Sequence, residues 1–497
     1  MKEQYAVFIE RFQKRLHEIF HSEHNINNLS LERGLPDEVW RGIMEQNPLS
    51  VAIPDQFGGR GANVRECLGI LSAASYESLS LSLTFGINIA LFLEPLAKYG
   101  HADIQQGIFD RFLKERAMGG LMITEPDFGS DALNMRTSYV ESEAGFKLEG
   151  QKHWQGLTGM ADFWIVAARK KNQAGDLARD VEFFVTDNSK AEQHIPVEEY
   201  FNNLGLYMIP YGLNKIDLNV PHTHKLQQYS TGIKMMLDIL HRSRMQFPGM
   251  GMGFIQRMLD DSLAHCLKRK VGAQSLYHID SVQYQLSRIQ TAYTLCSGMC
   301  AWSSSVSGIE FDLATEGLEA NAMKALVTDL MQESAQIAVQ LSGSSGYKLD
   351  HVAGRGIVDS RPFQIFEGSN EMLYTQIAEI VVKQMKKAKE SHIGTFLAGF
   401  EQTKRVLDRF KKHFDISLSA TNLVQRQLVV FGKAIARLVC LQYVDHMVSK
   451  GFRTDLFEQA AKHVEMDVKA LLSDFIDFND AAPIVEYQEK SDWASFI

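Results

Sequence analysis

The chain of 497 residues has little of what marks several large classes of protein. Its five cysteines are an odd, scattered set, which argues against a disulfide scaffold and suggests reduced thiols in a cytosol-like compartment. No basic run stands out and the formal net charge is −9, so nucleic acid is not an expected partner. We expect no apolar stretch to reach the roughly 18 residues that span a bilayer, and no signal-peptide pattern is expected at the start of the chain. We therefore expect a cytoplasmic protein.

A metal site is not expected either. Cys296 and Cys300 lie one helical turn apart, but no His or Cys pair stands beside them at a ligand spacing. What is present is ordinary for a globular protein, with 45% hydrophobic and 22% charged residues. Length alone favours roughly three folding units, and no internal repeat is visible.

The period of the apolar residues changes along the chain and indicates four parts. Helical spacing dominates the N-terminal part, for example over Val64–Glu77 and 104–113. Short alternating or β-rich runs follow, among them 163–168 and 214–220. Helical spacing then returns and is sustained over 318–341. The predicted domains are residues 1–120 (helical), 121–225 (β), 226–390 (helical bundle) and 391–497 (a helical extension, with helices expected around Phe396–Phe414 and Leu423–Val448).

Two segments of the β part have a composition suited to binding. The loop 124–131 has hydroxyls on Thr124 and Ser130, and Gly129 would let the backbone approach a ligand closely. An ordinary capped turn explains the same residues. Trp154 follows a turn and could stack on a planar ring, although packing in the core is the simpler interpretation.

Two segments of the bundle are also candidates. Gln340, Gly343 and Ser344 could admit a phosphate or ribose against bare backbone, or could simply end a helix. Glu367 is surrounded by apolar neighbours, which raise the pKa of a carboxyl group and suit it to accept a proton near neutral pH. An exposed glutamate near the start of a helix is the plainer alternative for Glu367, and Ser369 or Asn370 could cap that helix.

Taken together and in order, these segments resemble the acyl-CoA dehydrogenases over about residues 31–390. The blocks that carry the resemblance are Thr124-Glu125-Pro126 with Gly129-Ser130-Asp131, then Gly150-Gln151-Lys152-His153-Trp154, then Arg269, and finally 364–371. Each block alone is weak, but four at the right spacing are specific. The resemblance implies an α+β, mostly α fold: an N-terminal helical domain, a central small β-barrel domain and a C-terminal four-helix bundle, followed here by an extra helical extension.

The resemblance also implies an oxidoreductase of fatty acid beta-oxidation type that binds FAD. The implied reaction is the α,β-dehydrogenation of an acyl-CoA thioester to the trans-2-enoyl-CoA. Glu367 matches the base that removes the α-proton, while a hydride leaves Cβ for flavin N5. Implied partners are an acyl-CoA or acyl-carrier thioester, an acceptor of the electron-transfer-flavoprotein type, and further copies of the chain in a homodimer or homotetramer.

The remaining site residues are carried over by the same resemblance. The residues that match flavin-binding positions are Leu121, Met122, Ile123, Thr124, Ser130, Trp154, Gly156, Arg269, Asp280, Gln340, Gly343, Ser344, Ser369 and Glu371. Of these, Arg269, Gln340, Gly343 and Ser344 are expected to serve the FAD of a neighbouring subunit. Ser130, Arg244 and Gly368 match the substrate side. Some relatives place the base one position before Arg244, where this chain has Ser243, which cannot take the proton.

Several positions depart from the family pattern. Gly156 lacks the hydroxyl that would bond flavin N5, Gly272 and Asp280 replace usual cofactor contacts, and Val358 replaces an arginine. Each loss removes a contact of about 0.5–1.5 kcal/mol. Two alternatives therefore stay open: a degenerate relative that serves as an assembly or scaffold protein, and a flavin oxidase that uses oxygen. The extension resembles that of the very-long-chain branch, where it aids dimerisation and membrane association; an extra packed bundle is the plainer alternative.

Overall fold

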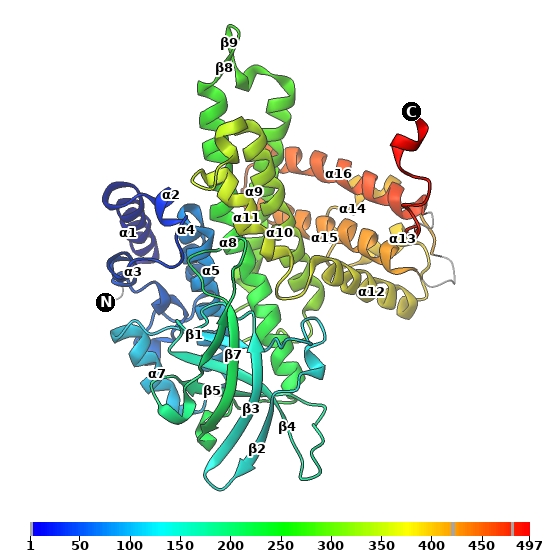
Figure 1. The fold of residues 1–497 in the computed structure, drawn as a ribbon. Coiled ribbons are helices and arrows are strands. Elements are labelled where there is room, and N and C mark those ends of the chain that lie inside the picture. The colour runs from blue at the N-terminus through cyan, green and yellow to red at the C-terminus, as the bar shows by residue number, and fades with distance from the viewer. Residues whose placement is uncertain (1–2, 419–422, 479–481) are drawn as a thin grey trace.

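The computed structural model describes residues 3–418, 423–478 and 482–497. A long central helix runs through the molecule, with a β sheet at one end, N-terminal helices on one side and the C-terminal helices on the other (Figure 1). This is the predicted architecture: a helical domain, a curled β domain, a helical bundle and a helical extension, in that order along the chain.

The N-terminal part is built from short helices that pack on the central bundle. Its elements are α1 (Tyr5–Glu18), η1 (Ile19–Glu23), α2 (Ile26–Leu29), α3 (Asp37–Met44), η2 (Pro48–Ala52), η3 (Asp55–Phe57), α4 (Val64–Glu77), α5 (Leu79–Asn88), η4 (Ile89–Leu93), α6 (Glu94–Tyr99) and α7 (Ala102–Lys114). Polar side chains fix where two of them begin. The Asn63 side chain accepts from Arg65 N ahead of α4, and Ser78 accepts from Leu81 N ahead of α5.

Two helices correct the expectation that no segment is apolar and long enough to span a bilayer. Leu79–Tyr99, formed by α5, η4 and α6, and the later helix Gln425–Val448 both reach that length and hydropathy. The most apolar stretch of Leu79–Tyr99 is 94% buried inside the protein and that of Gln425–Val448 is 67% buried. Burial of this degree is what core helices show, so the apolar surface is explained by packing.

The β domain is one seven-stranded sheet of order β1-β4-β2-β3-β7-β6, in which β5 pairs with β4. The strands are β1 (Gly119–Met122), β2 (Ser138–Ser142), β3 (Gly145–His153), β4 (Phe163–Lys170), β5 (Glu182–Asp187), β6 (Val197–Tyr200) and β7 (Gly212–Val220), with short 3-10 turns η5 (Ala132–Asn134), η6 (Ala191–Gln193) and η7 (His222–His224) between them. The longest pairing is antiparallel, between β3 and β7. Along β7 buried and non-buried residues alternate, which is the period that predicted this strand.

The bundle consists of long helices that pack on one another through α10. Its elements are α8 (Gly232–Lys268), β8 (Lys270–Val271), β9 (Gln274–Ser275), η8 (Leu276–His278), α9 (Asp280–Val306), α10 (Gly317–Ser342), η9 (Gly343–Tyr347), α11 (Val352–Ser360), η10 (Arg361–Gln364) and α12 (Asn370–Ala388). Helix α10 packs on α8, α9 and α12, and α8 also packs on α4 of the N-terminal part.

The extension packs directly on this bundle. Its elements are α13 (Ile393–Gly399), α14 (Leu407–Phe410), η11 (Lys411–His413), α15 (Gln425–Val448), α16 (Thr454–Ile476) and η12 (Trp493–Phe496). Helix α15 lies against α9, α10 and α12, and α16 covers α15 and α9. The helix predicted around Phe396–Phe414 is wrong as a continuous element. The segment forms two short helices joined by turns. The chain changes direction between Phe400 and Leu407, and in this way Phe400, Leu407 and Phe410 all reach the core.

Candidate functional site

The loop after β1 is held in place by a buried ion pair. Lys152 on β3 is fully buried; its Nζ donates to Glu125 Oε1 at 2.8 Å and to Ile123 O at 2.8 Å. Glu125 also accepts from the backbone N–H groups of Arg136 and Thr137. Leu121 and Met122 end β1, and Ile123 and Thr124 follow them into the loop. Gly129 and Ser130 are exposed at its far end, where a side chain added at Gly129 would meet open space.

The turn after β3 lies beside this loop. His153 N and Gln155 Nε2 both donate to Thr124 O, at 3.0 and 3.1 Å. Trp154 has a positive φ of 60° and is 53% exposed, and its ring lies tilted against the rings of Phe201 and Tyr211. The core-packing interpretation of Trp154 is therefore wrong, because an indole in the core would not be half in solvent.

Gly156, two residues on, faces apolar side chains. A Cβ built there would lie 2.7 Å from Ile87 Cδ1, 3.3 Å from Ile209 Cγ2 and 3.4 Å from a ring carbon of Tyr211. A hydroxyl-bearing residue at position 156 would thus displace Ile87. The packing around position 156 therefore agrees with the absence of a side-chain hydroxyl there.

Glu367 lies between η10 and α12 with its carboxylate turned inward. Its Oε1 accepts a hydrogen bond from Ser243 Oγ at 2.8 Å, on α8. Its Oε2 is buried without a hydrogen-bond partner among the described residues. Such an atom normally costs about 1–3 kcal/mol, so it needs an explanation. A base that must take a proton from carbon has this property, because a C–H group offers it no conventional hydrogen bond before reaction.

The backbone of Glu367 is strained and firmly held. Its φ is +52°, an uncommon value for a residue with a Cβ. Arg244 Nε donates to Glu367 O at 3.0 Å, and buried Lys324 Nζ donates to Gly368 O at 2.8 Å and to Asn370 Oδ1 at 3.1 Å. These two cations come from α8 and α10, so the two helices together fix the loop. Arg244, expected on the substrate side, positions the base residue itself.

Burial and the nearby charges shift the pKa of Glu367 in opposite directions. Burial raises the pKa of Glu367, while the hydrogen bond from Ser243 and the charges of Arg244 and Lys324 lower it in part. Burial also lowers the pKa of Lys324 to about 7. The net result is a carboxyl group with a raised pKa, as its apolar neighbours predicted.

The start of α12 differs in detail from the sequence-based expectation. Ser369 occupies the capping position but its side chain makes no capping hydrogen bond. Asn370 instead bonds across to α10, where its Nδ2 donates to Ala325 O, Thr328 Oγ1 and Asp329 Oδ1. Glu371 is exposed in the first turn. The helix is thus anchored by tertiary contacts, which leaves the Ser369 hydroxyl available.

The remaining predicted cofactor residues gather at the opposite end of the bundle. Arg269 follows α8, Asp280 begins α9, Gln340 is in the last turn of α10, and Gly343 and Ser344 begin η9; all five are exposed. A small apolar cluster of Cys266, Val282, Leu286 and Leu341 holds these helix ends together. Arg244 and Arg269 are 25 residues apart, about 38 Å along an α-helix. The tip residues therefore lie far from Glu367, and Figure 1 shows the tip at the end of the bundle away from the sheet.

Some residues of the site could not be read from sequence. Ser243 cannot act as a base, yet it donates a hydrogen bond to the base. Lys324 lies within a long apolar helix, and a lysine at a buried position of such a helix is the one signal in the sequence that could have marked it. Ile87, Ile209 and Tyr211 come from distant segments, and no local pattern marks them.

The sequence matches models of all three domains of one family. The acyl-CoA dehydrogenase N-terminal domain matches residues 10–116, the middle domain 120–217 and the C-terminal domain 230–382. Together they cover well over half of the chain, in the family's order. The chain belongs to the acyl-CoA dehydrogenase family.

Individual relatives are distant. The mitochondrial very long-chain specific acyl-CoA dehydrogenase of Mus musculus is 22% identical over 357 residues, covering 71% of this chain and 54% of the relative. The chain thus spans about half the length of such relatives. An acyl-CoA dehydrogenase of Bacillus anthracis, solved in complex with FAD, superposes with a TM-score of 0.76 at 15% identity, covering 99% of this chain and 91% of that one. A prolyl acyl carrier protein oxidase, AnaB, superposes with a TM-score of 0.66 at 17% identity over 76% of this chain and 99% of that one.

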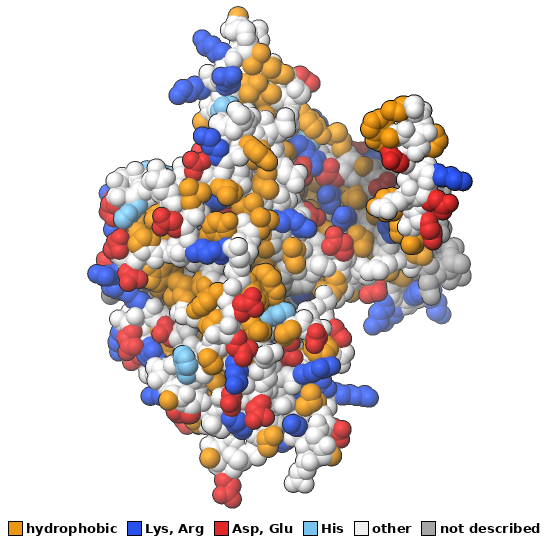
Figure 2. Space-filling model, in the orientation of Figure 1, with side chains coloured by type: hydrophobic (Ala, Val, Ile, Leu, Met, Phe, Trp, Pro, Cys, Tyr) orange, Lys and Arg blue, Asp and Glu red, His pale blue; other side chains and the backbone are white. Residues whose placement is uncertain are grey.

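The side chains described above fit a flavin cofactor of the kind this family uses. The half-exposed Trp154 offers a planar face, the backbone at Gly129 is open, and the buried Oε2 of Glu367 awaits a partner. Apolar side chains also lie along the junction between the sheet and the helices (Figure 2). Gly156 fits less well, because it has no hydroxyl to bond the flavin ring and the space beside it is occupied by apolar side chains.

Proposed function

We propose that this protein is an FAD-dependent dehydrogenase of acyl thioesters, which converts an acyl-CoA to the trans-2-enoyl-CoA. The observation that carries the proposal is the buried Oε2 of Glu367, which has no hydrogen-bond partner in the described part of the chain, on a residue whose other carboxylate oxygen and backbone carbonyl are both held by hydrogen bonds. Membership of the family supplies the reaction class, and retention of the glutamate supports an active member.

The residues divide the work as follows. Glu367 Oε2 accepts the α-proton, and the raised pKa of its carboxyl makes it a stronger base than a solvated carboxylate. Ser243, Arg244 and Lys324 keep this carboxylate and its loop in one position. When bound, FAD supplies the redox chemistry by taking the hydride that leaves Cβ. Thr124, Ser130, Trp154 and Ser369 are the residues of this chain that would hold it.

The test is anaerobic reduction of the purified protein's flavin by a panel of acyl thioesters that differ in chain length and carrier. Bleaching of the yellow protein by at least one acyl-CoA is the expected result, followed by reoxidation through an electron-transferring flavoprotein. Protein that stays colourless after addition of FAD would contradict the proposal. The panel also separates CoA from carrier-protein thioesters, which matters because one structural neighbour is a prolyl acyl carrier protein oxidase.

Ser243 is expected to set the pH at which the base works. Its hydroxyl donates to Glu367 Oε1 and so favours the ionised form. In Ser243→Ala the pKa of Glu367 rises further, and because only the carboxylate accepts the proton, the acidic limb of the rate–pH profile moves to higher pH. Flavin reduction in single-turnover experiments measures it. Ser243→Thr keeps the hydroxyl and should retain the wild-type limb; a Thr variant that shifts as far as Ala would refute the assignment.

We further propose a homo-oligomer in which the tip of one bundle serves the flavin site of another copy. Apolar side chains are exposed around this tip (Figure 2), among them Leu267, Val271 and Tyr347. Among the described residues the guanidinium of Arg269 makes no hydrogen bond or ion pair, and Arg269 lies too far from its own chain's Glu367 to share its cofactor. Loss of a charged contact costs about 1.5–3 kcal/mol. Arg269→Ala should therefore lose FAD on dilution about 10- to 150-fold more readily, as measured by flavin retention, while Lys387→Ala on α12 should not.

One observation favours the second candidate, a scaffold or assembly protein that no longer turns over. The space beside Gly156 is lined by Ile87 and Ile209, so a hydroxyl-bearing side chain at position 156 would fit only if Ile87 moved. Such a protein would bind FAD weakly and would not be bleached by any thioester. A flavin oxidase differs in the last step only, and rapid reoxidation by oxygen in place of the flavoprotein acceptor would identify it. A cytoplasmic location remains a prediction.

A further inference from the structure

Two histidines and a glutamate meet at the outer edge of the N-terminal domain, away from the residues discussed above. His17 is in the last turn of α1 and His21 is four residues later in η1, so both rings project from the same side of a continuous helical segment. Glu77 is the last residue of α4. One ligand atom from each of the three residues lies within 4.8 Å of the others.

The geometry is close to what a bound transition metal needs. His17 Nδ1 lies 3.6 Å from Glu77 Oε1, and His21 Nε2 lies 2.6 Å from Glu77 Oε2. In a tetrahedral zinc site, bonds of about 2.0–2.1 Å place neighbouring ligand atoms roughly 3.4 Å apart. The first pair already has this spacing, and the second is a hydrogen bond that must open by less than about 1 Å. The two pairs use different oxygens of the Glu77 carboxylate, so a bound ion also requires the two rings to shift toward one donor set, whose atoms already lie within 4.8 Å of one another.

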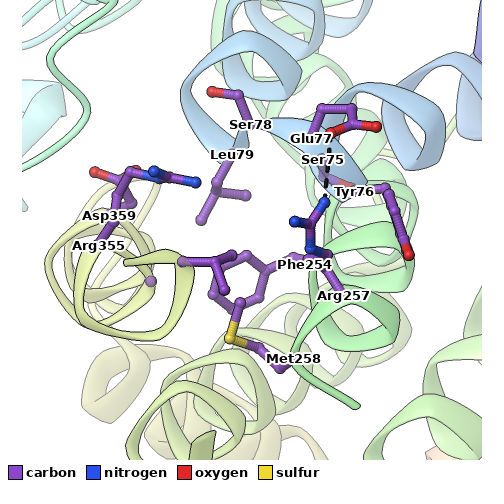
Figure 3. A pocket seen from close by; sticks show the side chains of 12 residues that line it. Ser75, Tyr76, Glu77, Ser78, Leu79, Phe254, Arg257, Met258, Arg355 and Asp359 are labelled. Atoms are coloured by element: carbon purple, nitrogen blue, oxygen red, sulfur yellow. Dashed lines mark hydrogen bonds and ion pairs between the residues drawn. The ribbon is translucent and has the colours of Figure 1, made fainter. Parts of the chain in front are cut away.

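The charge and burial of the three residues also suit a cation. The side chain of Glu77 is only 6% exposed, so its position is fixed, whereas that of His17 is 67% exposed and gives solvent and ion access. Arg257 Nη1 lies 3.4 Å from Glu77 Oε2, as the dashed line in Figure 3 shows. Arg257 is shared with Asp261, to which its Nε donates at 2.8 Å, so the charge of Glu77 is only partly neutralised.

We propose that His17, His21 and Glu77 form a binding site for a divalent transition-metal ion of the zinc class. Two imidazoles and one carboxylate are an established ligand set for zinc, with water in the fourth position. No metal site is expected from the sequence, because the third ligand is 56 residues from His21 and is brought beside it only by the fold.

A metal ion here links the first helical segment to α4. Ser78, the residue after Glu77, begins α5, and its hydroxyl donates to Met208 Sδ in the segment that leads to Tyr211. The link therefore ends next to a contact between the N-terminal helices and the β domain. We expect metal binding to stabilise the N-terminal domain without changing the chemistry at Glu367.

The experiment uses the full-length, untagged holoprotein after treatment with a chelator. Titration with Zn²⁺ should give one tight site per chain and a rise in the melting temperature. Titration with Co²⁺ should give the visible absorption of a tetrahedral site with nitrogen and oxygen ligands. His17→Ala, His21→Ala and Glu77→Gln should each weaken binding at least about 100-fold.

His24→Ala is the matched control, because His24 follows the same helical segment outside the trio. It should bind zinc as the wild type does. The proposal is overturned if the wild type binds no zinc more tightly than His17→Ala does. It is equally overturned if His24→Ala weakens binding as much as the trio variants, because that pattern describes adventitious surface histidines. Glu77→Gln also breaks the contact to Arg257, so His17→Ala, which has no such contact, decides the outcome if Glu77→Gln does not fold.

Discussion

Replacing Glu367 by Gln is expected to lower the rate of flavin reduction by an acyl thioester about 10²- to 10⁴-fold, the usual contribution of a positioned general base. Gln has nearly the same shape, so the hydrogen bond from Ser243 and the loop held by Arg244 can survive. The amide cannot take the α-proton. Stopped-flow reduction under anaerobic conditions measures the rate, and the absorption of the oxidised flavin shows that the cofactor is still bound.

Glu379→Gln provides the matched control for Glu367→Gln. Glu379 is exposed further along α12, so the same change of charge occurs there without touching the loop. We expect its reduction rate and pH profile to equal those of the wild type. Full turnover in Glu367→Gln with bound flavin would remove Glu367 as the base, and with it the explanation of its unpartnered Oε2.

Much of the fold follows from local periodicity in the sequence. The helical spacing over Val64–Glu77 predicts α4 with its observed bounds, and the alternation over 214–220 predicts most of β7. Both segments bury one face, so the pattern and the structure report the same partition between core and solvent. Phe396–Phe414 is the instructive failure. Phe400, Phe410 and Phe414 are buried, but turns interrupt the helix between them, and periodicity alone cannot detect a change of chain direction.

The site residues likewise divide into those that a local stretch of sequence reveals and those that only the folded structure brings together. Blocks of neighbouring residues, such as 124–131 and 364–371, could be found because each is a contiguous stretch of sequence. The hydrogen bond between Ser243 and Glu367 joins residues 124 positions apart, and the ion pair of Lys152 with Glu125 depends on the register of the sheet. Such contacts are products of tertiary folding. The exposure of Trp154 is also a product of tertiary folding, because distant segments of the chain decide whether its ring is covered.

The extension contributes to the site through the helix that follows Glu367. Tyr374, one turn into α12, donates from its hydroxyl to Asp329 Oδ2 at 2.7 Å, and the Oδ1 of the same Asp329 accepts from Asn370. Gly432 of α15 lies directly over the backbone of Tyr374: a Cβ at position 432 would be 1.9 Å from Tyr374 O. The two helices therefore meet backbone to backbone, at a distance that only glycine permits.

Gly432→Ala is for this reason expected to destabilise the protein by about 3 kcal/mol, at the upper end of the usual cost of overpacking. In an unobstructed helix the same substitution stabilises by up to about 1 kcal/mol, and Gly399→Ala in α13, which meets nothing within 4 Å, tests that sign in the same extension. Thermal melts of both variants measure the contrast. Because α12 must move away from α15, we also expect Gly432→Ala to slow flavin reduction by displacing Asn370 and the loop before it. A Gly432→Ala protein as stable as wild type would show that α15 does not rest on α12, and the extension would then have no part in positioning Glu367.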